Sequence, residues 1–175
     1  KDCLCEDDVD ISVGGYELSN KLGDITDGIK WTWAKNDFTI HYFDQFLKSC
    51  DFYKIVNTLY GNNFHIRGAS FITIDKQELK HADFHLDIND LSNNKTTGIL
   101  TVLFPLFELS DKMGHLEYVN NDGEIAVYNY KVDKMLVWDA CDLNHRTQPY
   151  KLDKKKKRVL VSINLSTDED YFKVI

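Results

Sequence analysis

The sequence predicts a mainly β domain, a β-sandwich or jelly roll with helices packed against one sheet. Three observations predict this class. Helical periodicity is confined to a stretch that ends at Gly61, short β-rich runs follow one another from there to the end of the chain, and polar turns separate these runs. A chain of 175 residues has the length of one ordinary domain and can bury a substantial core.

Two strands and two helices are expected before Gly61. Alternation at Ile11, Val13 and Tyr16 predicts one strand, and alternation of Trp31 and Trp33 predicts another over residues 29–34. The first helix has apolar residues at the spacing of one buried face: Tyr42, Phe43, Phe46, Leu47 and Cys50. Asp51 is suited to cap the start of a second helix, and Gly61 to end it. That helix carries Ile55, Val56, Leu59 and Tyr60.

The remainder of the chain predicts a series of short strands. They cover approximately residues 64–74, 82–88, 97–107, 115–119, 124–130, 134–139, 143–148 and 158–165. The cluster Asn120–Gly123 contains Asp-Gly, which is a strong hairpin signal. The lysine run at 154–157 is interpreted as a solvated loop between strands. No internal repeat or second domain is evident, so residues 1–175 are expected to form one domain.

Composition excludes some classes of function. No apolar run reaches roughly 18 residues, so no membrane partner is expected. The net charge of −7 argues against nucleic acid as the main partner. The start of the chain has no apolar stretch of the kind found in signal peptides. The four cysteines are at positions 3, 5, 50 and 141, and a domain with this much core material is not expected to need a disulfide framework. We therefore expect reduced thiols and a cytoplasmic location.

The segment from His81 to Asp87 is rich in residues that can bind a metal. In a strand, His81, Asp83, His85 and Asp87 would point to the same side because side chains alternate between faces. Burying four such side chains without a purpose is costly. The alternative interpretation is the exposed polar face of an edge strand.

Two further residues complete a possible site. His145 lies about sixty residues downstream, and Arg158 opens the apolar run that ends the predicted β region. Two imidazoles and one carboxylate on one side of an octahedral metal form the facial triad of non-haem iron(II) oxygenases. A buried guanidinium can hold a distant carboxylate through two parallel hydrogen bonds.

Six pieces in the right order then carry a resemblance to a known family. They are His85-Leu86-Asp87, the apolar strand 98–106, Gly114-His115-Leu116, Trp138-Asp139, His145-Arg146-Thr147-Gln148-Pro149 and Arg158. Together they resemble the 2-oxoglutarate and iron(II)-dependent oxygenases, in particular the branch that contains prolyl hydroxylases. The usual Gly-Gly of that family is Gly114-His115 here, which bears on the turn more than on the metal.

The resemblance implies a fold and a set of roles. The fold would be a double-stranded β-helix over residues 63–166, with residues 1–62 as a helical support region. Iron(II) would bind His85, Asp87 and His145, and 2-oxoglutarate would bind Arg158, with Ser162 and Thr101 as further candidates for its pocket. With dioxygen, such an enzyme hydroxylates a peptide side chain, a prolyl one among the candidates, or a small metabolite, and releases succinate and CO2.

Three alternatives remain open at the level of sequence. His81 and Asp83 form a second His-x-Asp of the same parity, so alternation alone does not choose between the two pairs. The domain could be a catalytically inactive jelly-roll binding module. It could also be a cupin-like metalloenzyme without 2-oxoglutarate, which would not need a buried guanidinium at position 158.

Overall fold

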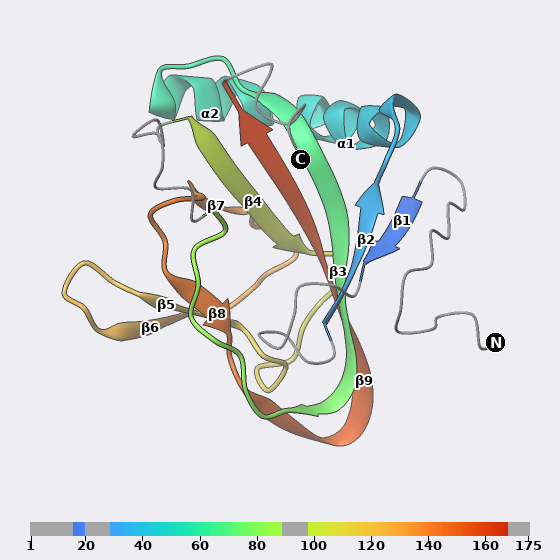
Figure 1. The fold of residues 1–175 in the computed structure, drawn as a ribbon, viewed down its shortest axis with the longest axis vertical. Coiled ribbons are helices and arrows are strands. Elements are labelled where there is room, and N and C mark those ends of the chain that lie inside the picture. The colour runs from blue at the N-terminus through green and yellow to red at the C-terminus, as the bar shows by residue number, and fades with distance from the viewer. Residues whose placement is uncertain (1–15, 20–28, 89–97, 168–175) are drawn as a thin grey trace.

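The computed structural model describes residues 16–19, 29–88 and 98–167 (Figure 1). Two helices, α1 (Asp37–Ser49) and α2 (Phe52–Tyr60), lie between the early strands and the β region. The strands are β1 (Tyr16–Ser19), β2 (Ile29–Ala34), β3 (His65–Leu79), β4 (Ile99–Pro105), β5 (Leu116–Val119), β6 (Ile125–Tyr128), β7 (Leu136–Asp139), β8 (His145–Thr147) and β9 (Tyr150–Ser166).

The strands form two antiparallel sheets. The larger has the order β1-β2-β3-β9-β4-β7, and the smaller has the order β6-β5-β8. In Figure 1 the β5–β6 hairpin extends from the side of the molecule, and α1 and α2 lie at one end of the larger sheet. A mainly β architecture with helices on one sheet was predicted, and the structure confirms it.

The larger sheet buries both of its faces. Val161, Ile163 and Leu165 of β9 pack in one cluster with Phe43, Leu47, Phe52 and Val56 from the two helices. Leu160 belongs to a second cluster that includes Leu116, Tyr130 and Trp138. Because side chains alternate along a strand, Arg158 and Ser162 share the face of Leu160, away from the helices. The face away from the helices therefore carries two of the residues predicted to bind 2-oxoglutarate.

The helices begin and end as local sequence chemistry requires, with one exception. Asn36 caps α1 by accepting a hydrogen bond from the Thr39 N–H at 3.0 Å. Gly61 ends α2 in the left-handed conformation, with φ of 71°. The predicted cap at Asp51 is wrong: this residue precedes α2 but adopts φ of 54°, and its side chain makes no capping hydrogen bond.

Not all of the predicted helix faces are buried. Phe43, Leu47 and Val56 lie in the core. In contrast, Tyr42 is 58% exposed, although the spacing of apolar residues had placed it on the buried side of the first helix, and Leu59 of α2 is 74% exposed. The predicted stripe of the first helix was too wide, because Phe43 and Leu47 alone of its five residues are in the core.

Three further differences concern the strands. Residues 82–88 are irregular, and His85 alone in this segment makes a β-bridge, to His145. The lysine run lies inside β9 rather than in a loop, with Lys156 opposite Lys76 and Lys157 opposite Asp75. Residues 29–34 form β2 as predicted, whereas the strand expected near residues 11–15 lies outside the described residues. The two early strands add to the larger sheet, so the region before residue 62 contributes more than helices.

The described residues contain neither a membrane-spanning helix nor a disulfide bond. Among the described residues, neither helix is both long and apolar enough to cross a membrane. Cys50 and Cys141 are thiols and not disulfide-bonded in the described part of the chain, while Cys3 and Cys5 lie outside it.

Candidate metal centre

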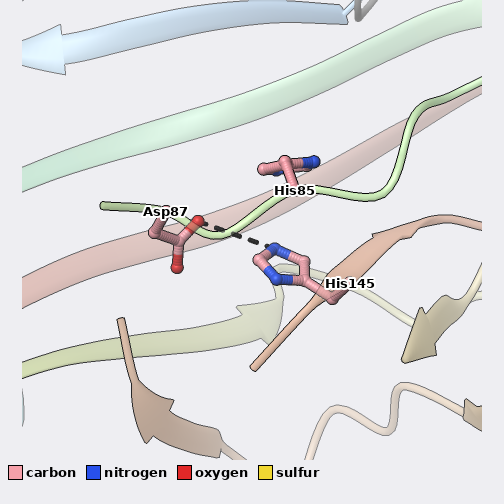
Figure 2. Close-up of side chains that lie close together, drawn as sticks. All are labelled: His85, Asp87 and His145. Atoms are coloured by element: carbon pink, nitrogen blue, oxygen red, sulfur yellow. Dashed lines mark ion pairs between the residues drawn. The ribbon is translucent and has the colours of Figure 1, made fainter. Parts of the chain in front are cut away.

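The structure brings His85, Asp87 and His145 together. Each of the three side chains offers one ligand atom, and these atoms all lie within 4.8 Å of one another. His145 Nε2 is 3.5 Å from Asp87 Oδ1 (Figure 2). His85 and Asp87 lie on the irregular segment that follows β3, and His145 is the first residue of β8. Segments about sixty residues apart therefore meet at one point.

Backbone hydrogen bonds orient both imidazoles. His85 Nδ1 lies 3.0 Å from the Asp83 carbonyl oxygen, and His145 Nδ1 lies 2.9 Å from the Leu143 carbonyl oxygen. In each case the ring bonds to the carbonyl two residues earlier, which places the proton on Nδ1. The Nε2 lone pair is then left for a metal, as metal-binding histidines require.

Two side chains of the larger sheet hold the Asp87 carboxylate. Thr101 Oγ1 donates to Asp87 Oδ2 at 2.6 Å, and Trp138 Nε1 donates to the same oxygen at 3.1 Å. Thr101 and Trp138 are direct cross-strand partners on β4 and β7. Two donors on Oδ2 leave Oδ1 facing His145, which suits a carboxylate that binds a metal through one oxygen.

The electrostatics favour neutral imidazole at His145. Burial lowers the pKa of His145, and the adjacent Asp87 carboxylate offsets part of that effect. A neutral imidazole is the form that binds metals. Two imidazoles and one carboxylate, with Nε2 and Oδ1 available, fit a divalent cation of the iron(II) type that keeps its remaining positions open.

Arg158 is a buried charge that forms no ion pair with another described residue. The residue is 1% exposed and lies opposite Ile74 of β3. Its Nε and NH1 atoms have no hydrogen-bond partner in the described part of the chain. Burial lowers the pKa of the guanidinium, and the nearby Tyr130 and Tyr150 act in the opposite direction. Because an unpaired buried charge is strongly destabilising, this arrangement fits a site for an anion.

Tyr130 connects this anion site with the triad. The Arg158 guanidinium carbon lies 5.4 Å from the centroid of the Tyr130 ring. Burial is the main reason that the pKa of Tyr130 is raised; the Arg158 charge lowers this pKa and the Asp87 charge raises it. Tyr130 also packs in one buried cluster with Trp138, whose indole donates to Asp87.

The other predicted residues fall into two groups. Ser162 and Thr101 lie opposite Ser70 and Trp138 in the sheet, on the face of Arg158. Thr101 contacts Asp87, and the predicted role of both residues in binding 2-oxoglutarate stays a prediction. His81 and Asp83 form a separate exposed pair, with His81 Nε2 2.5 Å from Asp83 Oδ1. The structure thus places the second His-x-Asp, and not the first, beside His145.

Several contacts around the site were not predicted from the sequence. Arg146 donates to Glu117 Oε2 at 2.7 Å and lies over the Phe84 ring, with its guanidinium carbon 4.3 Å from the ring centroid. Trp138 was noted in the sequence without its bond to Asp87. His115 and Tyr130 lie near Arg158. The departure from Gly-Gly at His115 was the one signal that could have directed attention there.

The fold is similar to the double-stranded β-helix of solved 2-oxoglutarate and iron(II)-dependent oxygenases, and within it the structure brings a His-x-Asp pair and a distal His together. No protein-family profile matches the chain, and no curated protein matches it by sequence.

Three solved structures illustrate the similarity. A prolyl-4-hydroxylase of Pseudomonas putida has a TM-score of 0.63 and 16% identity, with 87% of this chain and 78% of that chain covered. An oxidoreductase of the 2OG-Fe(II) oxygenase family from Burkholderia pseudomallei has a TM-score of 0.60 and 12% identity, covering 87% and 72%. HygX from Streptomyces hygroscopicus, solved with nickel and 2-oxoglutarate, has a TM-score of 0.60 and 11% identity, covering 89% and 84%.

Proposed function

We propose that this protein is a 2-oxoglutarate-dependent iron(II) oxygenase that hydroxylates a peptide side chain or a small metabolite. The observation that carries the proposal is the pairing of a complete triad with a buried guanidinium whose Nε and NH1 have no hydrogen-bond partner among the described residues. The triad alone would also suit a cupin-like metalloenzyme, but an enzyme that does not bind 2-oxoglutarate would not need a buried guanidinium at position 158.

Each residue of the site would have a defined task. His85, Asp87 and His145 would hold iron(II), which when bound supplies the activation of dioxygen. Arg158 would bind the far carboxylate of 2-oxoglutarate and so fix the orientation of its keto acid end. Thr101 and Trp138 would keep Asp87 Oδ2 engaged, so that Oδ1 faces the metal. Because position 87 carries a carboxylate, no place is left there for a halide ligand, and hydroxylation is the expected outcome.

The substrate is proposed only by class. The similarity to a prolyl-4-hydroxylase makes prolyl peptides the first substrates to screen, followed by small metabolites. The thiols of Cys50 and Cys141 support the proposal that the protein works in a reducing, cytoplasmic compartment.

The test is iron-dependent formation of succinate from 2-oxoglutarate in the presence of dioxygen. Wild-type protein should form succinate with Fe(II), and His85→Ala and His145→Ala should abolish this. His81→Ala is the matched control, since its imidazole lies on the same segment but outside the triad, and it should retain turnover. Iron binding without succinate formation would favour the cupin-like alternative. Failure to bind any divalent metal would favour a binding module instead.

A further inference from the structure

Three buried side chains have hydrogen-bond donors that no atom of the described residues accepts. They are Arg158, His115 and Tyr130, which are 1%, 2% and 3% exposed. Arg158 Nε and NH1, His115 Nε2 and the Tyr130 hydroxyl have no partner within the described residues. Such groups are rare in folded proteins, and each one that occurs calls for an explanation.

The three side chains are close to one another although they come from separate parts of the chain. Arg158 belongs to β9, His115 immediately precedes β5, and Tyr130 follows β6. The centroids of the His115 and Tyr130 rings are 6.1 Å apart, and the Arg158 guanidinium carbon is 5.4 Å from the Tyr130 centroid. One small group could therefore contact all three.

The proton on His115 is fixed by a backbone bond. The Tyr130 N–H donates to His115 Nδ1 at 3.1 Å, so Nδ1 must carry the lone pair and the neutral ring must carry its proton on Nε2. Burial, and then the charge of Arg158, lower the pKa of His115, in agreement with a neutral ring. The Ser110 carbonyl is close enough to affect this pKa but makes no hydrogen bond to Nε2. His115 thus presents Nε2–H as a donor.

The backbone around His115 is also held in place. The His115 carbonyl accepts a hydrogen bond from the Gln148 N–H at 2.8 Å. Gly114 has φ of +49°, and a Cβ there would lie 2.5 Å from Tyr150 Cδ1, so only glycine fits. The imidazole is therefore positioned by bonds and packing before any ligand arrives, which lowers the entropic cost of binding.

The chemistry of this set of donors selects one kind of ligand. Arg158 supplies one positive charge, while neutral His115 and neutral Tyr130 supply donors without charge. A carboxylate has one negative charge and about four lone-pair sites, so it can balance the charge and accept from all three groups. Tyr130 packs in the same buried cluster as Trp138, whose indole donates to Asp87, so this pocket and the triad border one cluster of side chains.

We infer that His115 and Tyr130 act with Arg158 as the donors that bind the far carboxylate of the co-substrate and make the site selective for a dicarboxylate. This inference rests on the proposed function, because it takes 2-oxoglutarate as the ligand. It assigns a role to His115, which stands where the family usually has the second glycine of Gly-Gly. It also assigns a role to Tyr130, which lies outside the six sequence pieces that resemble the family.

The test compares two acids in protein loaded with Mn(II), a substitute for iron that does not turn over. 2-Oxoglutarate has the keto acid end and the far carboxylate, whereas 2-oxobutyrate has the keto acid end alone. Tyr130→Phe removes only the hydroxyl. His115→Asn keeps an acceptor for the Tyr130 N–H and removes the Nε2–H donor. Tyr53→Phe is a control that removes a hydroxyl bonded to Asp44, far from this pocket in the fold.

Calorimetric titration should separate the outcomes. Tyr130→Phe and His115→Asn should each weaken 2-oxoglutarate binding about tenfold or more, as expected for a lost hydrogen bond to a charged group. Binding of Mn(II) and of 2-oxobutyrate should stay within about twofold of wild type, and Tyr53→Phe should leave all three unchanged. Variants that bind 2-oxoglutarate as wild type does, or that lose both acids equally, would overturn the inference and leave the proposed function standing. Wild-type protein that binds Mn(II) but not 2-oxoglutarate would overturn both.

Discussion

The backbones of His85 and His145 are joined by two hydrogen bonds of 2.9 Å, in which the N–H of each residue donates to the carbonyl of the other. This bridge places the two ring centroids 4.6 Å apart. The bonds are made by the main chain, so the relative position of the two imidazoles does not depend on a metal. The fold therefore builds the triad in advance, and residues that secure this bridge should control metal affinity.

Arg146 is the side chain best placed to secure it. It follows His145, its Nε donates to Glu117 of β5, and it stacks on Phe84, which precedes His85. Arg146→Met should keep the aliphatic packing and lose the ion pair and the stacking, and should weaken Fe(II) or Mn(II) binding about tenfold, as is usual for residues that orient metal ligands. Competition titration with a metal-responsive dye would measure this.

Lys151→Met is the matched control for this change. Lys151 of β9 lies 3.5 Å from Glu78 of β3 in an exposed pair, and neither residue belongs to the triad. Such a pair contributes little. An equal loss of metal affinity in both variants would show that Arg146 does not act through the bridge.

Thr101 and Trp138 offer a second way to change the metal ligands without removing one. Thr101→Val deletes the hydroxyl that donates to Asp87 Oδ2, and Trp138→Phe deletes the indole donor to the same oxygen. Each change frees the carboxylate to rotate, so each should weaken metal binding about tenfold. If Thr101 instead contacts 2-oxoglutarate, Thr101→Val should weaken the co-substrate and leave the affinity for Mn(II) unchanged, which the same titrations would reveal.

The site was predictable from the sequence where its chemistry is local. His85 and Asp87 are two residues apart, His145 begins the segment His145–Pro149, and Arg158 opens an apolar run. Residue type and order were therefore enough to predict these four residues as the site. Alternation could not choose between His81 and His85, because residues four apart share a face in any strand. The structure separates them because this segment is not a strand, and the bridge to His145 is made at residue 85.

The supporting contacts were not predictable, since they depend on register between distant strands. Trp138 meets Asp87 because β4 and β7 pair with Thr101 opposite Trp138, and no local pattern encodes that pairing. The lysine run shows the same limit. Its charges suggested a loop, but β9 continues through it because β3 pairs along nearly the whole strand. Tertiary pairing outweighs local propensity in both cases.

The turn before β5 can be tested with a pair of glycines. Gly114 and Gly123 both have positive φ, at +49° and +79°. A Cβ at Gly114 would lie 2.5 Å from Tyr150 Cδ1, whereas a Cβ at Gly123 would meet nothing within 4 Å. Gly123→Ala should therefore lose about 1 kcal/mol of unfolding free energy, from backbone strain alone.

Gly114→Ala should lose about 3 kcal/mol or more, because it adds a steric clash to the same strain. Urea denaturation of the two variants and wild type would measure both values. Similar losses in the two variants would mean that the Tyr150 ring moves aside readily and that the turn is not closely packed.

The stability of the metal-free protein should fall in mild acid because of His115. Burial lowers its pKa below the ordinary value of 6.5, so the unfolded chain binds this proton more readily than the folded protein does. This contribution to stability is complete above about pH 6.5 and is lost as the pH falls from there towards the lower pKa of the folded state. His145 has a lowered pKa for the same main reason and should add to the effect.

In His115→Asn one of the two contributions is absent. The drop in unfolding free energy between pH 7.5 and pH 5.5, measured by urea denaturation with a chelator present, should therefore be smaller in this variant than in wild type. A drop of the same size in both proteins would mean that His115 takes up its proton in the fold as easily as in the unfolded chain, against a buried neutral ring whose Nδ1 accepts from the Tyr130 N–H.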